Sequence, residues 1–426
     1  MKGKWLVALF FAFVLGLGWS LAGAAQAPQL PQPASFTTRA ITPFAIEGLT
    51  MDATGNFYTT GRQPDTTKKC PVWRISADGA TRVSVGFIPN SVLAPCNPSG
   101  ISFDEVGNLY IADAASGGNV WMVAPDPLGC ESDDSASNVC DAISNSPASS
   151  PTTAFAAGVP GTNGVAFDRD GNLWTGDGTM GQGRVWKIAG PGANCAPPTP
   201  VNCEEVFRIQ PMNNSASFGG VVPDPGVGRA NTTIPPGTPQ NLVANGLAFN
   251  NSGDLLIADT ARGAIWKVEF DRQGNLQSRT NGENPSCDGT FTANTLCLEN
   301  VFVAHPFLEG TDGIALDRAG NIWNSANERN AIVVVTKDGR VIEIFRNPAN
   351  AAGLRNSADA ENNRILEFPT SPFLSEKSFC TANSDGNRRD NSPNTVGEIV
   401  PAGPNRGKIS CMDQDLNIPG LPLPVQ

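Results

Sequence analysis

Four polar side chains in this sequence recur at one position, directly before a glycine and an alternating apolar segment. They are Glu47, Asn163, Asn245 and Asp312, and each can supply an oxygen ligand. Carboxylate and carboxamide oxygens suit Ca²⁺, which takes about six to eight of them in a flexible shell. If the fold brings the four together, they would bind one calcium ion and leave positions for water and substrate, as a catalytic metal needs.

The same four residues also fit two alternative roles. Asn or Asp before glycine commonly forms an Asx-turn at the start of a strand, which would account for each residue singly. It accounts less well for Glu47, which makes no Asx-turn. A calcium ion with a purely structural role, plugging a channel, is the second alternative.

These residues begin copies of one repeat. The copy Asn163-Gly-Val-Ala-Phe-Asp-Arg-Asp-Gly-Asn-Leu-Trp174 contains an alternating strand, a Gly-Asn turn and a second strand, which predicts a β-hairpin. A third strand marked by Val-Trp or Ile-Trp follows the first four hairpins, and a fourth, less regular strand can be placed after it. Four antiparallel strands make a propeller blade. The five clear copies begin at Glu47, Ser99, Asn163, Asn245 and Asp312.

A sixth copy is degenerate. Its segments are Pro369–Leu374, Lys377–Asn383 and Gly407–Met412, and the alignment of the repeats puts Ser371 at the position of the polar residues above. We therefore predict an all-β, six-bladed β-propeller over residues 44–413, with long disulfide-bonded loop insertions. The repeat resumes in phase after each insertion, which indicates surface loops within one domain. The insertions are Leu128–Pro151, Gly190–Val201, Asn213–Pro239 and Asn281–Thr295.

The ten cysteines are expected to form disulfides. They are an even set in a chain that begins with a targeting segment, and no CxxC zinc pattern occurs. Sequential pairing is favoured because each couple would close one loop or span one blade, although ten cysteines allow many connectivities. The couples are Cys70 with Cys96, Cys130 with Cys140, Cys195 with Cys203, Cys287 with Cys297, and Cys380 with Cys411.

Residues 1–24 are expected to be a cleaved signal peptide. Lys2 and Lys4 precede an apolar run from Trp5 to Leu21, and small residues follow up to Ala24. An uncleaved membrane anchor is the alternative. Residues 25–43 would then be an N-terminal extension and residues 414–426 a C-terminal tail. We expect the mature protein to be secreted or periplasmic, and no later apolar run is long enough to span a bilayer.

The motifs around the four polar residues resemble a known family. They are Ile46-Glu47-Gly48, Thr162-Asn163-Gly164, Ala244-Asn245-Gly246 and Thr311-Asp312-Gly313. The chain from about Phe44 to Asp413 resembles the calcium-dependent six-bladed propellers of the senescence marker protein, gluconolactonase and luciferin-regenerating enzyme family, to which diisopropyl fluorophosphatase is similar. The resemblance implies that Glu47, Asn163, Asn245 and Asp312 hold a catalytic calcium ion, and that Asp312 is the base or nucleophile.

Residues between the second and third strands of each blade should open on the same face as the four ligands. They are candidates for substrate contacts, with polar caps on strand ends as the alternative. Arg388 could bind an anionic substrate, or lie in a solvated loop. The only histidine, His305, has no G-x-S-x-G motif beside it, so serine hydrolase chemistry is not expected. The substrate-contact candidates are Asp113, Asp177, Asp259, Asn327, Asn383 and Arg388.

These observations favour an exported calcium-dependent hydrolase of a lactone, a related ester or a phosphotriester. The alternative is a non-enzymatic propeller with NHL-like repeats that binds a protein or carbohydrate on its top face. The formal net charge of −11 makes nucleic acid and anionic membranes poor partners. The expected partner is therefore a small molecule.

Overall fold

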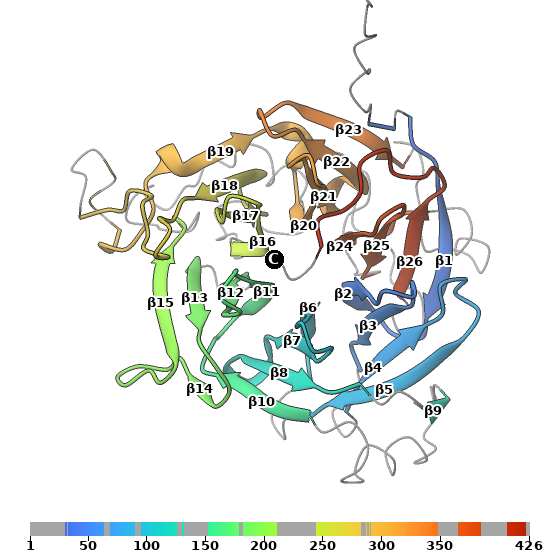
Figure 1. The fold of residues 1–426 in the computed structure, drawn as a ribbon, viewed down its shortest axis with the longest axis horizontal. Helices are drawn as coiled ribbons and strands as arrows, with labels where there is room; N and C mark the ends of the chain where they lie inside the picture. The colour runs from blue at the N-terminus through green and yellow to red at the C-terminus, as the bar shows by residue number, and fades with distance from the viewer. Residues whose placement is uncertain are drawn as a thin grey trace, which may run out of the picture.

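Six sheets surround a central channel, each sheet forming one blade, and their strands pair antiparallel except for β10 with β14 (Figure 1). The computed structural model describes residues 30–31, 33–63, 69–89, 95–125, 130–131, 152–178, 182–210, 244–282, 287, 289, 291–347, 365–384 and 407–422. The predicted six-bladed, all-β architecture is confirmed. The predicted signal peptide and Arg388 lie outside the described residues.

The first three blades run outwards from the channel in chain order. Two of them gain a short fifth strand at the outer edge, because β9 pairs with β5 and β14 pairs with β10. Blade 1 has β2 (Ile46–Met51), β3 (Phe57–Gly61), β4 (Cys70–Ile75), β5 (Arg82–Ile88) and β9 (Cys130–Glu131). Blade 2 has β6 (Pro98–Phe103), β7 (Leu109–Asp113), β8 (Asn119–Val123), β10 (Thr152–Ala157) and β14 (Ala193–Asn194). Blade 3 has β11 (Thr162–Phe167), β12 (Leu173–Asp177), β13 (Arg184–Ile188) and β15 (Cys203–Arg208).

The other three blades have four strands each. Blade 4 has β16 (Ala244–Phe249), β17 (Leu255–Asp259), β18 (Ala264–Val268) and β19 (Val301–Ala304). Blade 5 has β20 (Thr311–Leu316), β21 (Ile322–Ala326), β22 (Ala331–Val335) and β23 (Val341–Arg346). Blade 6 has β24 (Pro369–Leu374), β25 (Phe379–Asn383), β26 (Gly407–Met412) and β1 (Phe36–Thr42). Short 3₁₀ turns are η1 (Ala115–Gly117), η2 (Leu298–Asn300), η3 (Pro306–Leu308) and η4 (Asn327–Arg329).

The sixth blade is completed by the beginning of the chain. Strand β1 lies in the segment that the sequence analysis placed in an N-terminal extension, but it pairs antiparallel with β26, from Phe36 opposite Met412 to Thr42 opposite Gly407. Without β1 the sheet would end on β26 with unpaired backbone groups. Phe36 is 2% exposed and packs against the rings of Phe345 and Phe379. The first and last blades are therefore joined by strand pairing.

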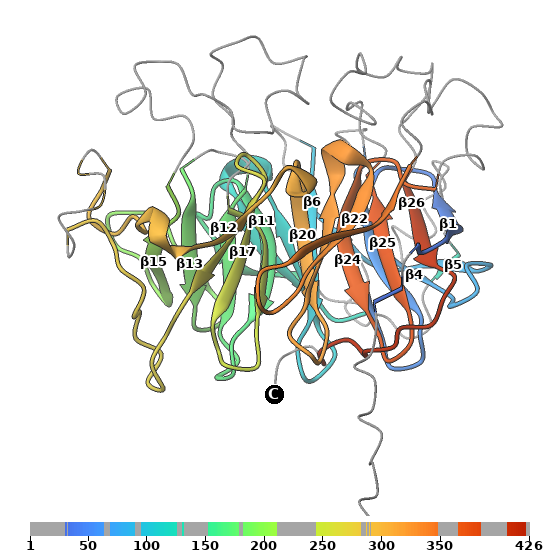
Figure 2. The ribbon, with the colours of Figure 1, turned by 90° about the horizontal axis from the view of Figure 1, so that it is seen from above.

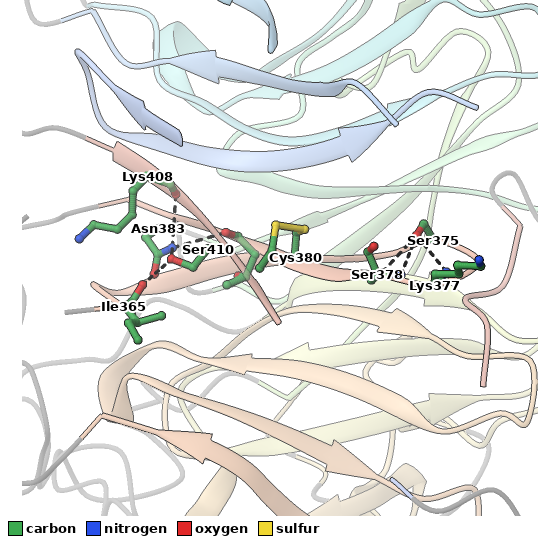
Figure 3. Close-up of a disulfide and its surroundings, with 10 residues drawn as sticks. Ile365, Ser375, Lys377, Ser378, Cys380, Asn383, Lys408 and Ser410 are labelled. Atoms are coloured by element: carbon green, nitrogen blue, oxygen red, sulfur yellow. Dashed lines mark hydrogen bonds between the residues drawn. A yellow bond between two sulfur atoms is a disulfide. The ribbon is translucent and has the colours of Figure 1, made fainter. Parts of the chain in front are cut away.

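Four of the predicted disulfides are present: Cys70–Cys96, Cys195–Cys203, Cys287–Cys297 and Cys380–Cys411. Cys380 and Cys411 face one another across β25 and β26, so their bond fixes the two strands that hold β1 in place (Figure 3). The fifth predicted couple depends on Cys140, which lies outside the described residues.

In blades 1, 2, 3 and 5, an aspartate holds the hairpin turn between the first two strands. In blade 3, Asp168 Oδ1 accepts hydrogen bonds from the backbone N–H groups of Asp170 (3.0 Å) and Asn172 (2.9 Å), and Oδ2 accepts one from Trp174 Nε1 (2.9 Å). Asp104 makes the same contact with Tyr110 in blade 2, at 3.1 Å. Burial and the charge of Asp104 raise the pKa of Tyr110 to about 12. This pattern recurs at Asp52 and Asp317.

The C-terminal segment closes one end of the channel. We call the face where the innermost strands begin the upper face and the one where they end the lower face. Residues 414–422 run along the lower face, on the lower side in Figure 2. The N–H groups of Gly420 and Leu421 donate to the carbonyls of Ser375 and Leu316, both at 2.8 Å. Leu421 thereby lines the end of an apolar channel of about 90 Å³. In the described part of the chain, no helix is long and apolar enough to cross a membrane.

The innermost strands approach one another so closely that five of them require glycine. A Cβ atom at these positions would lie only 2.2–2.5 Å from the carbonyl oxygen of the polar residue on the next blade, well inside normal contact distance. Neighbouring blades therefore touch through backbone alone around the channel. These glycines are Gly48, Gly100, Gly164, Gly246 and Gly313.

We predict that Gly246→Ala lowers the free energy of unfolding by about 1–3 kcal/mol, the usual cost of overpacking. Its Cβ would lie 2.4 Å from the Asp312 carbonyl oxygen, and backbone cannot move aside cheaply. The matched control is Gly190→Ala, because nothing lies within 4 Å of a Cβ there. Denaturant unfolding of both variants checks this. Equal stability of the two would contradict a steric role for the inner glycines.

Candidate functional site

One residue from each innermost strand forms a ring at the upper end of the channel. Each is the second residue of its strand, and successive members contact the glycine of the preceding blade through their carbonyl oxygens. The four predicted ligands are all members. The inner ring, as we call it, consists of Glu47, Ser99, Asn163, Asn245, Asp312 and Thr370.

The sixth member is Thr370, and the alignment that placed Ser371 there was wrong by one residue. In blade 6, Pro369 pairs with Asn383 and the register resumes at Pro372, as Thr311 and Ile314 do in blade 5. Ser371 therefore stands at the glycine position. The contact with the next blade is made here by a hydrogen bond, in which Thr370 Oγ1 donates to the Glu47 carbonyl at 2.7 Å.

The side chains of the four predicted ligands are buried at this ring, with 2–7% of each residue exposed. The Asn245 amide is oriented, since its Nδ2 donates to Thr260 Oγ1 at 3.0 Å and Oδ1 is left for another ligand. Within the described residues the Asn163 carboxamide makes no hydrogen bond, although Asn163 is only 5% exposed. A buried amide costs free energy unless it has a partner. These oxygens fit a hard cation better than they fit an empty protein interior.

A second ring surrounds the inner ring. Its members are the first residues after the second strand of each blade. In the five blades where both residues lie in the described part of the chain, their backbone N–H donates to the carbonyl two residues before the inner-ring residue of the same blade. The second ring consists of Arg62, Ala114, Gly178, Thr260, Asn327 and Ser384.

Members of the second ring touch the inner-ring residue of their own blade. Arg62 forms an ion pair with Glu47. Asn327 Nδ2 donates to Asp312 Oδ2 at 2.8 Å. Gly178 leaves room for Asn163, because a Cβ there would lie 2.6 Å from the Asn163 Cβ. The second ring therefore sets the orientation and charge balance of the groups at the channel mouth.

The predicted substrate contacts divide between two positions. Asp113, Asp177, Asp259 and Asn383 are the last residues of their strands and are at most 2% exposed. Asn327 follows the last residue of its strand, Ala326, so it belongs to the second ring. The sequence analysis missed this one-residue offset because blade 5 has Ala326 at the strand-end position and the polar residue comes one place later.

The strand-end residues make hydrogen bonds within their own blades. Asp259 Oδ2 accepts from Trp266 Nε1 (2.9 Å) and from Arg262 Nη1 (2.7 Å). Asp113 likewise accepts from Trp121 Nε1 at 3.1 Å. Asn383 donates to Ser410 Oγ at 3.1 Å (Figure 3). These hydrogen bonds cap the ends of second strands against the third strands, which is the polar-cap alternative for this set.

Further groups at this face act on the scaffold. His305 Nδ1 accepts from the backbone N–H of Phe307 at 3.0 Å and caps η3. Arg329 is 8% exposed, pairs with Glu343 at 2.8 Å and lies 3.8 Å from Glu309. These contacts hold η4, the turn that begins with Asn327. The described residues contain no cluster of three or more His, Cys, Asp and Glu side chains suited to a metal. The inner ring has two carboxylates, so amide oxygens must complete any cation site there.

Comparison with protein families now bears on these residues. Residues 229–353 match the model of the SMP-30/Gluconolactonase/LRE-like region. The family resemblance is thereby confirmed for a segment that includes two inner-ring residues, Asn245 and Asp312. A search of curated proteins finds no match.

Solved structures share the propeller at low identity. Regucalcin from Agrobacterium tumefaciens, a calcium-binding protein, is 14% identical, covers 92% of this chain and 98% of its own, and has a TM-score of 0.52. The PQQ-bound aldose sugar dehydrogenase from Streptomyces coelicolor is 13% identical, with 90% and 100% covered and a TM-score of 0.50. A luciferin-regenerating enzyme is 12% identical, with 91% and 97% covered and a TM-score of 0.48. At this identity the likeness shows the fold alone.

We predict that Thr260→Val lowers the free energy of unfolding by about 1–3 kcal/mol, because it leaves two buried polar groups without partners. Thr260 Oγ1 donates to the Thr311 carbonyl at 2.5 Å as well as accepting from Asn245. Thr54→Val, at an exposed turn, is the control and should cost much less. Thermal unfolding of both variants is the measurement. A neutral Thr260→Val would mean that the second ring does not anchor the first.

Proposed function

We propose that this protein is a calcium-dependent hydrolase of a lactone or related ester, with its active site at the inner ring. The observation that carries the proposal is the set Glu47, Asn163, Asn245 and Asp312, four buried oxygen-bearing side chains at equivalent positions around one channel mouth. Such a donor set suits calcium. The match of residues 229–353 to a family named for gluconolactonase supports the reaction class.

The position of the ring favours catalysis over a structural plug. Below it, the channel is apolar and ends at Leu421. The inner ring lies beyond this apolar segment, at the upper end of the channel, where a ligand could approach it from the upper face. Four side-chain ligands leave coordination positions for water and substrate, whereas a structural ion is normally enclosed by protein ligands.

Glu47, Asn163, Asn245 and Asp312 would hold the ion. Bound calcium would supply Lewis-acid polarisation of the scissile carbonyl. Asp312 would accept the proton of the attacking water, while Asn327 holds its carboxylate through the 2.8 Å hydrogen bond to Oδ2. The water oxygen bonds to the carbonyl carbon, the C–O bond of the lactone breaks, and the proton passes from Asp312 to the leaving alkoxide. Glu47 and Asp312 together balance two positive charges.

We also propose that the protein works in an oxidising compartment, secreted or periplasmic. Four disulfides, in blades 1, 3, 4 and 6 and their loops, support this location, because such bonds persist outside the reducing cytosol. The expected substrate is a small molecule.

We predict that calcium raises the melting temperature of the parent, and that Asn245→Ala reduces the rise by weakening calcium binding. One neutral oxygen ligand is lost, and binding to the folded state stabilises it by mass action. Asn275→Ala, at an exposed turn, should keep the parental response. Differential scanning calorimetry across a millimolar calcium titration, starting from chelator-treated protein, measures it. An identical response of Asn245→Ala and the parent would remove Asn245 from the site.

We predict that Asp312→Asn lowers kcat for lactone hydrolysis by roughly 10²–10⁴, the usual range for losing acid–base catalysis. The amide keeps an oxygen ligand but cannot take up the proton. A lactone panel assayed with and without chelator, with calcium binding measured in parallel, tests the role. If the variant binds calcium and hydrolyses lactones at the parental rate, Asp312 is a ligand only.

A further inference from the structure

Arg62 is the one charged member of the second ring. Its companions at the equivalent position are Ala114, Gly178, Thr260, Asn327 and Ser384. Its guanidinium pairs with Glu47, one of only two carboxylates in the inner ring. One of the two inner-ring carboxylates is therefore already paired with a positive charge.

The arginine is anchored but not enclosed. Its backbone N–H donates to the Ala45 carbonyl at 2.8 Å, and its Nε donates to the Pro98 carbonyl at 3.3 Å. The Arg62 side chain is 30% exposed, against 9% for Glu47. The guanidinium therefore has access to solvent, whereas the carboxylate is buried.

A guanidinium and a divalent cation compete for the same carboxylate oxygens. Two cations a few ångströms apart repel, more strongly in a partly buried site than in water. Binding an ion at Glu47 must therefore weaken or displace the Arg62 contact, and the free energy of that contact is subtracted from the affinity for the ion. The second-ring residue that contacts Asp312, Asn327, is neutral.

We propose that Arg62 is an internal competitor for the cation at Glu47 and sets the calcium affinity of the inner ring. The inference rests on the proposed cation site. In the cation-free protein Arg62 holds the buried Glu47 carboxylate, and on cation binding it turns out towards the channel mouth. Arg62 is thus a positioning and tuning residue, not a ligand.

Titration calorimetry of calcium alone into chelator-treated protein tests this. Arg62→Gln should bind calcium at least about tenfold more tightly than the parent, because it removes a nearby like charge. Arg62→Lys, which keeps the charge, should stay closer to the parent. The matched control is Arg318→Gln, which breaks an exposed Arg318–Glu376 ion pair on the lower face and should leave the affinity unchanged. Equal or weaker binding by Arg62→Gln would overturn the proposal.

A measurement on the parent covers the case in which Arg62→Gln does not fold. Phenylglyoxal modification followed by peptide mapping should show that calcium increases the reactivity of Arg62 and leaves that of Arg318 unchanged. Reactivity of Arg62 that stays constant or falls would overturn the proposal. If the parent and Arg62→Gln both fold and neither binds calcium, the proposed function itself fails. If Arg62→Gln binds calcium and the parent does not, the result supports the proposal, because Arg62 then prevents calcium binding at Glu47.

Discussion

The contact between backbones around the channel is the constraint on which the rest of this structure depends. Five innermost strands carry a glycine whose missing side chain lets the carbonyl of the next blade approach. This contact fixes the radius of the ring. It also fixes the positions of the residues directly before the glycines, among them Glu47, Asn163, Asn245 and Asp312. Because ring closure and side-chain placement share the same residues, the candidate site is built by the interaction that builds the fold.

The hydrogen bonds that stabilise the propeller and the polar groups of the candidate site lie at opposite ends of the channel. The lower face has aspartate-held turns and a C-terminal segment that donates backbone hydrogen bonds to the ends of β20 and the β24–β25 turn. On the upper face the Asn163 amide makes no hydrogen bond with any described residue. Buried polar groups of this kind cost free energy unless something binds them. The lower end is therefore braced by backbone hydrogen bonds, while the upper end holds a buried amide without a described partner, an arrangement common at functional sites.

The blades and most of the inner ring were predictable, because two separate sequence patterns mark each repeat. Alternating apolar residues gave the hairpins, and the polar residue before each glycine gave the inner ring except in blade 6. There the glycine is replaced by Ser371, so the pattern lost its marker and the alignment moved by one residue. Strand β1 lacks the repeat phrase altogether, since an outer strand needs only one buried face. Its pairing with β26 is a long-range contact that local pattern does not report.

The second ring was the least predictable part of the candidate site. Its residues are also the ones on which the proposed tuning of the site depends. Its members, from Gly178 to Arg62, share no chemistry, so no sequence pattern marks the position; only backbone hydrogen bonds identify it. The propeller fold is shared with an aldose sugar dehydrogenase as well as with a calcium-binding regucalcin, so the fold does not select an activity. The family match covers Asn245 and Asp312 but begins at residue 229, far along the chain from Arg62. The second ring, with the Arg62–Glu47 pair, is therefore the part of the site whose residues differ most from blade to blade, and it is where the proposed tuning of the inner ring is placed.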